Sequence, residues 1–285
     1  MSEELIPTES HRLFGGAVEV HCFGTRYGNW SMAGKTPEEA EMNNPGIIER
    51  MRRLADQFNC AVFAPNPSSF NAMVVGPNAF HQEWIENSLI RGPMADGVYL
   101  RHRNMAFGVT SADCPTVILH DPCPDGLTVA AHAGRDSLID RAFLESRSPE
   151  RAHESVVSAM LSVMGSGAWH LRAFIACGIS PHRFSHPFED EQHGQTNRLI
   201  TDYIVEKWGA TCVPGDRRSG RLWLTEIIRR QLADLGLDPS HIGCDGVDTY
   251  DDRDETLKPH WYSRRRARAT PSTPDGRNLM LVIRR

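Results

Sequence analysis

Residues 110–135 read TSADCPTVILHDPCPDGLTVAAHAGR, and this segment sets the expected architecture at the centre of the chain. Two short apolar runs, 116–119 and 127–130, flank residues 121–126, whose prolines, aspartates and glycine predict a turn. The pattern predicts two neighbouring strands of a hairpin. Cys114 precedes the first run and His132 ends the second, so a thiol and an imidazole separated by 18 positions are expected at adjacent strand ends. Two such donors suit a metal ion or a nucleophile–base pair.

The composition limits the classes of protein that the chain fits. Its 285 residues allow one large domain or two small ones, and 40% hydrophobic residues suffice for a substantial core. The net charge of −5 favours neither nucleic acid nor a membrane surface, so we expect neither as a partner. No apolar run approaches the length of about 18 residues that a membrane-spanning helix needs.

The seven cysteines indicate a reducing compartment. They occur singly, without a CxxC pair, and their number is odd. The first residues lack the basic and apolar pattern of a signal peptide. This usage argues against a disulfide framework, and we expect a cytoplasmic protein.

Alternating and helical apolar patterns predict an uneven succession of strands and helices. Strands are expected at 17–23, 61–64, 73–75, 97–100, 105–109, 171–176 and 280–283. Helices are expected at 47–55, 149–164, 193–208 and 223–235. Residues 1–15 are expected to be a loose lead-in, and 76–94 a loop with a short helix around 81–87. The order predicts an α/β or α+β fold with a mixed sheet. No linker or repeat appears, so residues 1–285 are interpreted as one domain.

Six segments in order resemble the YfiH/laccase-domain family, also described as polyphenol oxidases and linked to purine nucleoside chemistry. They are HCFGTRYGNWS at 21–31, ADG at 95–97, TSADCP at 110–115, HAG at 132–134, IACGISP at 175–181, and WYSRRR at 261–266 with DGR at 275–277. The resemblance implies a four-layer α/β/β/α fold around a mixed β-sandwich. It also implies a metal site that includes Cys114 and His132.

The chain departs from the family at the third metal ligand. The family's Q-V-H-G motif should fall near residues 68–71, which contain no histidine. His81, about ten positions further on, is the candidate substitute if the loop folds back. The chain is therefore interpreted as a diverged family member with zinc as its expected cofactor and copper as a less favoured one.

The resemblance also supplies candidates for catalysis and substrate binding. Arg26, at the family's T-R position, is the first candidate to hold phosphate, because a guanidinium matches phosphate oxygens. The candidates that assist it are Arg135, Arg265 and Arg277. Asp113 would orient a ligand or accept a substrate hydroxyl, with a strand-end cap as the alternative. Ser180 and His182 are expected in a pocket wall. The arginine-rich C-terminus, which includes Arg264, is either a solvated face or an anion-binding edge.

The residues and the resemblance together suggest four alternative functions. The first is a zinc-dependent enzyme that acts on purine nucleosides by phosphorolysis or deamination, with a nucleoside and phosphate as small-molecule partners. The second is a metal-free hydrolase or amidase with Cys114 as nucleophile and His132 as base. The third is copper-dependent phenol oxidation, which the scattered histidines support poorly. The fourth is a ligand-binding domain without turnover.

Overall fold

Two mixed β-sheets form the centre of the molecule. The computed structural model describes residues 4–67, 72–139, 144, 155–165 and 167–285. One sheet has the order β1 (Glu9–Leu13), β2 (Val18–Phe23), β13 (Asn278–Arg284), β8 (Met105–Ser111), β3 (Ala61–Asn66), β6 (Leu89–Met94) and β5 (Gln82–Ile85). The other has the order β12 (Ile242–Cys244), β11 (Arg172–Ala176), β9 (Thr116–His120), β10 (Thr128–His132), β7 (Gly97–Leu100) and β4 (Val74–Val75).

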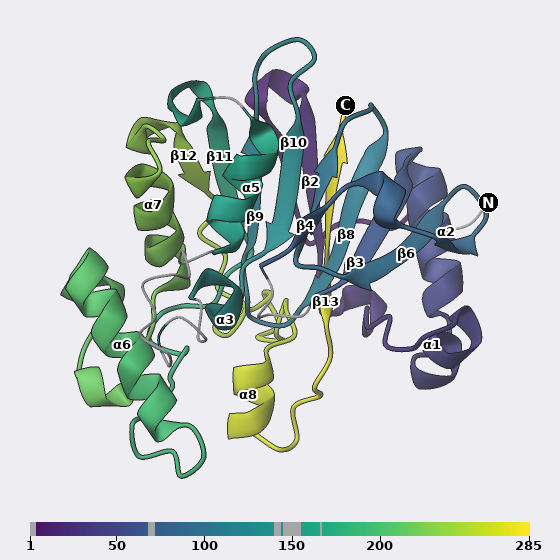
Figure 1. The fold of residues 1–285 in the computed structure, drawn as a ribbon. Helices are drawn as coiled ribbons and strands as arrows, with labels where there is room; N and C mark the ends of the chain where they lie inside the picture. The colour runs from purple at the N-terminus through teal and green to yellow at the C-terminus, as the bar shows by residue number, and fades with distance from the viewer. Residues whose placement is uncertain (1–3, 68–71, 140–143, 145–154, 166) are drawn as a thin grey trace.

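Helices cover the outer face of each sheet (Figure 1). On the side of the seven-stranded sheet lie α1 (Pro37–Asn43) and α2 (Ile47–Phe58). On the side of the six-stranded sheet lie α3 (Arg135–Leu138), α5 (Val156–Met164), α6 (Gly194–Trp208) and α7 (Leu224–Asp234). The short α8 (Arg264–Ala269) projects below the sheets in this view. The result is the expected four-layer α/β/β/α arrangement.

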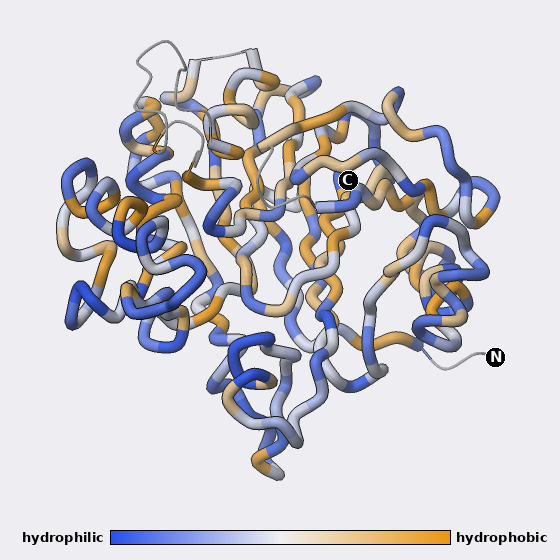
Figure 2. Tube along the Cα trace, turned by 60° about the horizontal axis from the view of Figure 1, so that its bottom comes forward, coloured by the Kyte–Doolittle hydropathy of each residue, from blue (hydrophilic) through white to orange (hydrophobic). Residues whose placement is uncertain are grey.

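The side chains of each strand alternate between its two faces. This alternation produces one apolar layer between the sheets and one beneath the helices on each outer face. In β9, Val117 and Leu119 face the outer helices, whereas Ile118 between them faces the other sheet. In β13, the odd-numbered residues 279–283 pack towards α2, and Met280 and Val282 pack between the sheets. The orange strand segments at the centre of Figure 2 reflect this burial on both faces.

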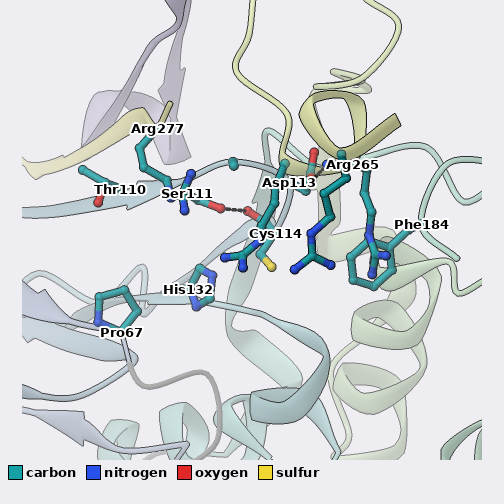
Figure 3. Close-up of a pocket in the computed structure, with 12 residues that line it drawn as sticks. Pro67, Thr110, Ser111, Asp113, Cys114, His132, Phe184, Arg265 and Arg277 are labelled. Carbon is teal, nitrogen blue, oxygen red and sulfur yellow. Dashed lines mark hydrogen bonds between the residues drawn. The ribbon is translucent and has the colours of Figure 1, made fainter. Parts of the chain in front are cut away.

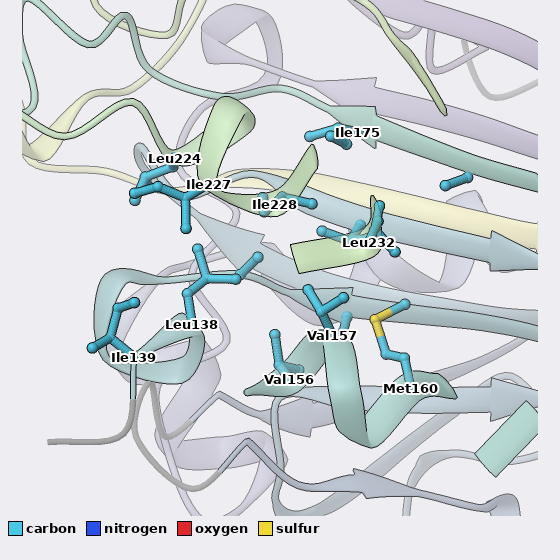
Figure 4. Close-up of a cluster of buried hydrophobic side chains, with 14 of the residues drawn as sticks. Leu138, Ile139, Val156, Val157, Met160, Ile175, Leu224, Ile227, Ile228 and Leu232 are labelled. Carbon is cyan, nitrogen blue, oxygen red and sulfur yellow. The ribbon is translucent and has the colours of Figure 1, made fainter. Parts of the chain in front are cut away.

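Helices α5 and α7 pack against the outer face of the six-stranded sheet (Figure 4). Val157 and Met160 of α5 and Ile228 of α7 are completely buried there. Ser155 begins α5 with a capping box, in which its side chain accepts from the Ser158 amide. Residues 149–154, which the sequence assigned to this helix, lie outside the described residues.

The central hairpin is confirmed. Strands β9 and β10 pair antiparallel, with Thr116 opposite His132 and His120 opposite Thr128. Residues 121–126 form the connection, in which the Asp121 amide donates to the Leu127 carbonyl over 2.9 Å. Cys114 and His132 therefore lie at one end of the hairpin, and Asp121–Gly126 lies at the other.

Two predictions of irregular structure are wrong. Part of the 1–15 lead-in is β1, an edge strand that pairs with β2 and alternates half-buried with exposed residues. Most of the 76–94 loop is the β5–β6 hairpin, in which Asn87 adopts a positive φ of 56°. Both segments contain many polar residues because they lie at or beside the edges of the sheet, where one side of a strand needs no apolar cover.

Among the described residues, no helix combines the length and the apolar character that crossing a membrane requires.

Candidate active site

A cavity of about 360 Å³ opens where β8, β9 and β10 approach α8 (Figure 3). The thiol of Cys114 and the imidazole of His132 point towards each other in this cavity. The lining residues are Pro67, Thr110, Ser111, Ala112, Asp113, Cys114, His132, Phe184, Arg264, Arg265, Arg268 and Arg277. The predicted Cys114–His132 pair thus lies in a cavity together with two of the predicted arginines, Arg265 and Arg277.

Backbone contacts fix the position of the pair. The Ser111 hydroxyl donates to the Cys114 carbonyl over 2.9 Å and holds the turn that follows β8. The Ala133 amide donates to the Pro115 carbonyl over 2.8 Å, which ties the end of β10 to the start of β9. These two hydrogen bonds join the segments that carry Cys114 and His132.

His132 is buried between an acid and a thiol. Its side chain is 6% exposed, and its Nδ1 lies 3.6 Å from Oδ1 of the fully buried Asp96. Burial by itself lowers the pKa of His132, but the charge interactions and hydrogen bonds with Cys114 and Asp96 outweigh it and raise the pKa to about 10. The raised pKa favours the protonated imidazole at neutral pH. Asp96 belongs to the ADG segment but was not among the predicted site residues.

Asp113 supports the site rather than offering a free carboxylate. Its Oδ1 accepts from the Thr249 hydroxyl over 3.1 Å, and its Oδ2 accepts from the Arg265 amide over 3.0 Å. Burial raises the pKa of Asp113, and hydrogen bonds, including one from Ser263, oppose that rise. The structure therefore favours the capping interpretation over a direct contact with substrate, because Asp113 holds the first turn of α8 against the end of β8.

The arginines make the cavity strongly cationic. Within the described segments, no Asp or Glu side chain lies within 4.0 Å of the guanidinium nitrogens of Arg264, Arg265 or Arg268. Arg277 is paired with Asp275 over 2.7 Å. The Arg265 guanidinium lies over the Phe184 ring, 4.9 Å from its centroid, and burial lowers the pKa of Arg265. Three arginines without a carboxylate in ion-pair contact, beside a fourth that is paired, form a set of donors that fits an anion.

Arg135 lies behind the cavity wall, where it contacts His186. Its Nη1 lies 2.8 Å from His186 Nδ1 and donates to Asn197 Oδ1 over 2.8 Å. Arg265 Nη2 lies 2.7 Å from His186 Nε2 on the other side of the ring. Burial and these two cations strongly lower the pKa of His186, so its ring is neutral. Arg135 thus reaches the site only through His186 and Arg265.

Three predicted site residues lie elsewhere. Arg26 is exposed and lines a separate cavity of about 510 Å³ with Lys258 and His260, because the Thr25 amide is tied to the His260 carbonyl over 2.8 Å. Ser180 lines a third cavity, of about 330 Å³, and its amide donates to Asp248 Oδ1 over 3.0 Å. His182 is exposed, and nothing places it at the Cys114 cavity.

The predicted three-ligand metal set is not assembled. His81 is exposed before β5 and does not line the cavity, because residues 82–94 form a hairpin instead of a loop that folds back. Residues 68–71, where the family histidine was expected, lie outside the described residues and contain no His, Cys, Asp or Glu. In the described part of the chain, Cys114 and His132 thus have no third ligand of these types, whereas a catalytic zinc site normally uses three.

Asp96 and Phe184 were not predicted, and an anion-binding edge was one of two alternatives for the basic run that contains Arg264 and Arg268. The signal for the arginines is the density of basic residues near the C-terminus, which predicts either a solvated face or an anion-binding edge. The basic run lies at the cavity because helix α8 begins there. The Ser263 hydroxyl accepts from the Arg266 amide, and Asp113 accepts from the Arg265 amide.

Comparisons with known proteins agree with this fold. The structure is similar to a hypothetical protein YfiH from Bacillus licheniformis (TM-score 0.64, 16% identity, 94% of this chain and 93% of the other). It is also similar to a DUF152 protein of Neisseria meningitidis (TM-score 0.61, 19% identity, 94% of each chain). The third is YlmD from Geobacillus stearothermophilus (TM-score 0.62, 17% identity, 99% of this chain and 100% of the other).

No curated protein sequence matches the chain. A family model described as multi-copper polyphenol oxidoreductase laccase matches residues 47–285, a range that includes the whole Cys114 cavity. Because that match spans most of the 285 residues, the chain belongs to this laccase-like YfiH family.

Proposed function

We propose that the protein is an enzyme that cleaves a purine nucleoside with phosphate at the Cys114–His132 cavity. The observation that carries the proposal is the meeting of the buried Cys114–His132 pair with four arginines around one cavity, where the pKa of His132 is raised. The arginines suit an anionic co-substrate, and the imidazolium suits a reaction that needs a proton donor.

Phosphorolysis uses both features. The arginines hold hydrogen phosphate, one of whose oxygens attacks C1′ of the ribose as the glycosidic bond breaks. The bonding electron pair moves onto the purine, and His132 donates its proton to a ring nitrogen of that leaving group. The hydrogen of the attacking phosphate then restores the proton on His132, so the products are the free base and ribose 1-phosphate.

Asp96 and Cys114 act on His132 in this scheme. Both lie beside the imidazole and raise the pKa of His132, which favours its protonated form before the reaction. Phe184 fixes Arg265 through the cation–π contact, so that a phosphate ligand meets a positioned guanidinium. Deamination fits the cavity less well, because its attacking group is hydroxide and the four arginines would have no anionic co-substrate.

Zinc stays a prediction for this cavity. Cys114 and His132 supply a thiolate and an imidazole, which are zinc ligands, but the four arginines disfavour a dication beside them. No step of the proposed reaction goes through a metal.

The test is release of free base from inosine and adenosine with phosphate present or omitted. The proposal predicts base release that depends on phosphate and yields ribose 1-phosphate in equal amount. Release without phosphate, or ammonia without base, would contradict it. Metal analysis of the same preparation establishes whether the activity follows bound zinc.

A thiol hydrolase is the second candidate. The spatial arrangement favours it, because His132 lies between Asp96 and Cys114. A nucleophile, a base and an orienting acid have this order in cysteine hydrolases. The Cys114 sulfur would attack a carbonyl carbon, and the leaving amine would take the His132 proton. An acyl-thioester on Cys114, detected by mass spectrometry and absent in Cys114→Ser, would favour this candidate over phosphorolysis.

A further inference from the structure

Three side chains with metal-binding atoms meet at the opposite end of the central hairpin. Asp121 and Cys123 belong to the β9–β10 connection, and His170 ends the 3-10 helix η4 (Ala168–His170) before β11. One ligand atom from each lies within 4.8 Å of the other two, and His170 Nε2 is 3.4 Å from Asp121 Oδ1. Among the described residues, no other such group of three His, Cys, Asp or Glu side chains was found.

The connection holds these ligands in place. The Cys123 amide donates to Asp121 Oδ1 over 2.9 Å, and the Gly126 amide donates to the Cys123 carbonyl over 2.8 Å. A Cβ at Gly126 would lie 2.2 Å from the Asp121 carbonyl oxygen, so the tight approach requires glycine. Pro122 and Pro124, on either side of Cys123, restrict the backbone further. The carboxylate and the thiol are therefore presented by a rigid turn.

The spacing between His170 and Asp121 matches that of two ligands in a tetrahedral zinc centre. With ligand bonds of about 2.0–2.3 Å, two ligand atoms of a tetrahedron lie roughly 3.3–3.8 Å apart. The 3.4 Å between His170 and Asp121 falls in that range. Cys123 is exposed, and its side chain hydrogen-bonds Asp121, so the thiol already lies beside the carboxylate. Thiolate and imidazole select zinc-like metals over magnesium or calcium.

We propose that Asp121, Cys123 and His170 form a binding site for a zinc-type divalent metal, separate from the Cys114 cavity. The metal joins the β9–β10 turn to η4, two segments that flank neighbouring strands of one sheet. Exchangeable solvent completes the coordination, because two of the residues are partly open and the third is exposed. Binding releases the Cys123 thiol proton and leaves the thiolate on the metal.

The test uses the full chain, prepared metal-free with a chelator and titrated with Zn²⁺ and with Co²⁺. We expect one metal per chain at this site and a thiolate-to-cobalt charge-transfer band in the absorption spectrum. Cys123→Ser should abolish the band, and His170→Ala should weaken binding at least tenfold. Cys244→Ser is the matched control, because Cys244 is the other exposed cysteine and should leave both signals unchanged.

The same titration on Cys114→Ala separates this site from the cavity. The proposal requires that Cys114→Ala keeps the metal, the charge-transfer band and the rise in melting temperature on adding zinc. The proposal is overturned if Cys123→Ser binds zinc as tightly as the wild type. It is equally overturned if the wild type binds no zinc at micromolar concentrations, or if Cys114→Ala alone removes the band.

Discussion

At each end of the β9–β10 hairpin a cysteine and a histidine lie near a carboxylate, but only the Cys114–His132 pair also lies among arginines. At one end, Cys114 and His132 face a cavity lined by four arginines. At the other, Cys123 and His170 face the carboxylate of Asp121. A cysteine and a histidine therefore do not define a site by themselves. We expect the surrounding arginines to decide whether a site prefers an anion or a metal cation.

The largest effect should come from removing His132, the proposed proton donor in the Cys114 cavity. His132→Gln removes the imidazolium but keeps a side chain of similar size, so turnover in phosphorolysis should fall by about 10²–10⁴-fold. Steady-state kinetics with inosine and saturating phosphate measure the change. His182→Gln is the control, since this exposed histidine lies outside the cavity. A variant at His132 with normal turnover would remove this residue from the mechanism.

The second-largest effect should be on phosphate binding in the Cys114 cavity. Arg265→Ala removes a charge-assisted donor, which should raise KM for phosphate roughly 10–100-fold while zinc binding at Cys123 stays the same. The matched variant Arg26→Ala removes an exposed arginine that lines a different cavity, and it should leave KM unchanged. If Arg26→Ala proves to be the harmful substitution, the phosphate site lies at the predicted T-R segment after all.

A smaller effect should appear in the pH profile. The pKa of His132 is raised to about 10, so the proton donor stays charged through neutral pH and activity should decline only as the pH passes about 10. Asp96→Asn removes one of the charges that raise this pKa and should move the alkaline limb down by about one to three pH units. The pH dependence of kcat, measured for both proteins, checks this shift. An unmoved limb would mean that Asp96 does not control the protonation of His132.

The smallest effect should be on the stability of the fold, and it comes from His120 in strand β9, which connects the two sites. His120, the residue before Asp121, is buried, its Nδ1 lies 3.0 Å from the Thr128 hydroxyl, and burial lowers its pKa to about 4. Because its folded pKa lies below the unfolded value of 6.5, the unfolded chain takes up a proton first as the pH falls. The stabilisation is complete above about pH 6.5 and is lost towards pH 4.

Urea unfolding of the wild type between pH 4 and 7 should therefore show a contribution of about 1–3 kcal/mol from this histidine. His120→Gln should lower stability at neutral pH but flatten its decline towards pH 4. Equal slopes for the two proteins would show that His120 is not the titrating group.

The sequence predicted the hairpin well because its two strands are buried on both faces and its turn carries proline and glycine. It failed for β1 and for β5–β6, whose edge positions allow polar residues such as Gln82 and Glu83. For the site, it identified Cys114 and His132 and two lining arginines. It misplaced Arg26, Ser180 and His182, because their positions depend on how loops pack, and residue spacing carries no information on that packing.

Thermal unfolding with phosphate and, separately, with zinc tests the contrast between the two ends most directly. The proteins to compare are the wild type, the double variant Arg265→Ala/Arg268→Ala, and Cys123→Ser. A ligand that binds only the folded protein raises its melting temperature. We predict that phosphate stabilises the wild type and Cys123→Ser but not the double variant, and that zinc stabilises the wild type and the double variant but not Cys123→Ser. Loss of both responses in one variant, or the reverse pairing of ligand and variant, would contradict the account.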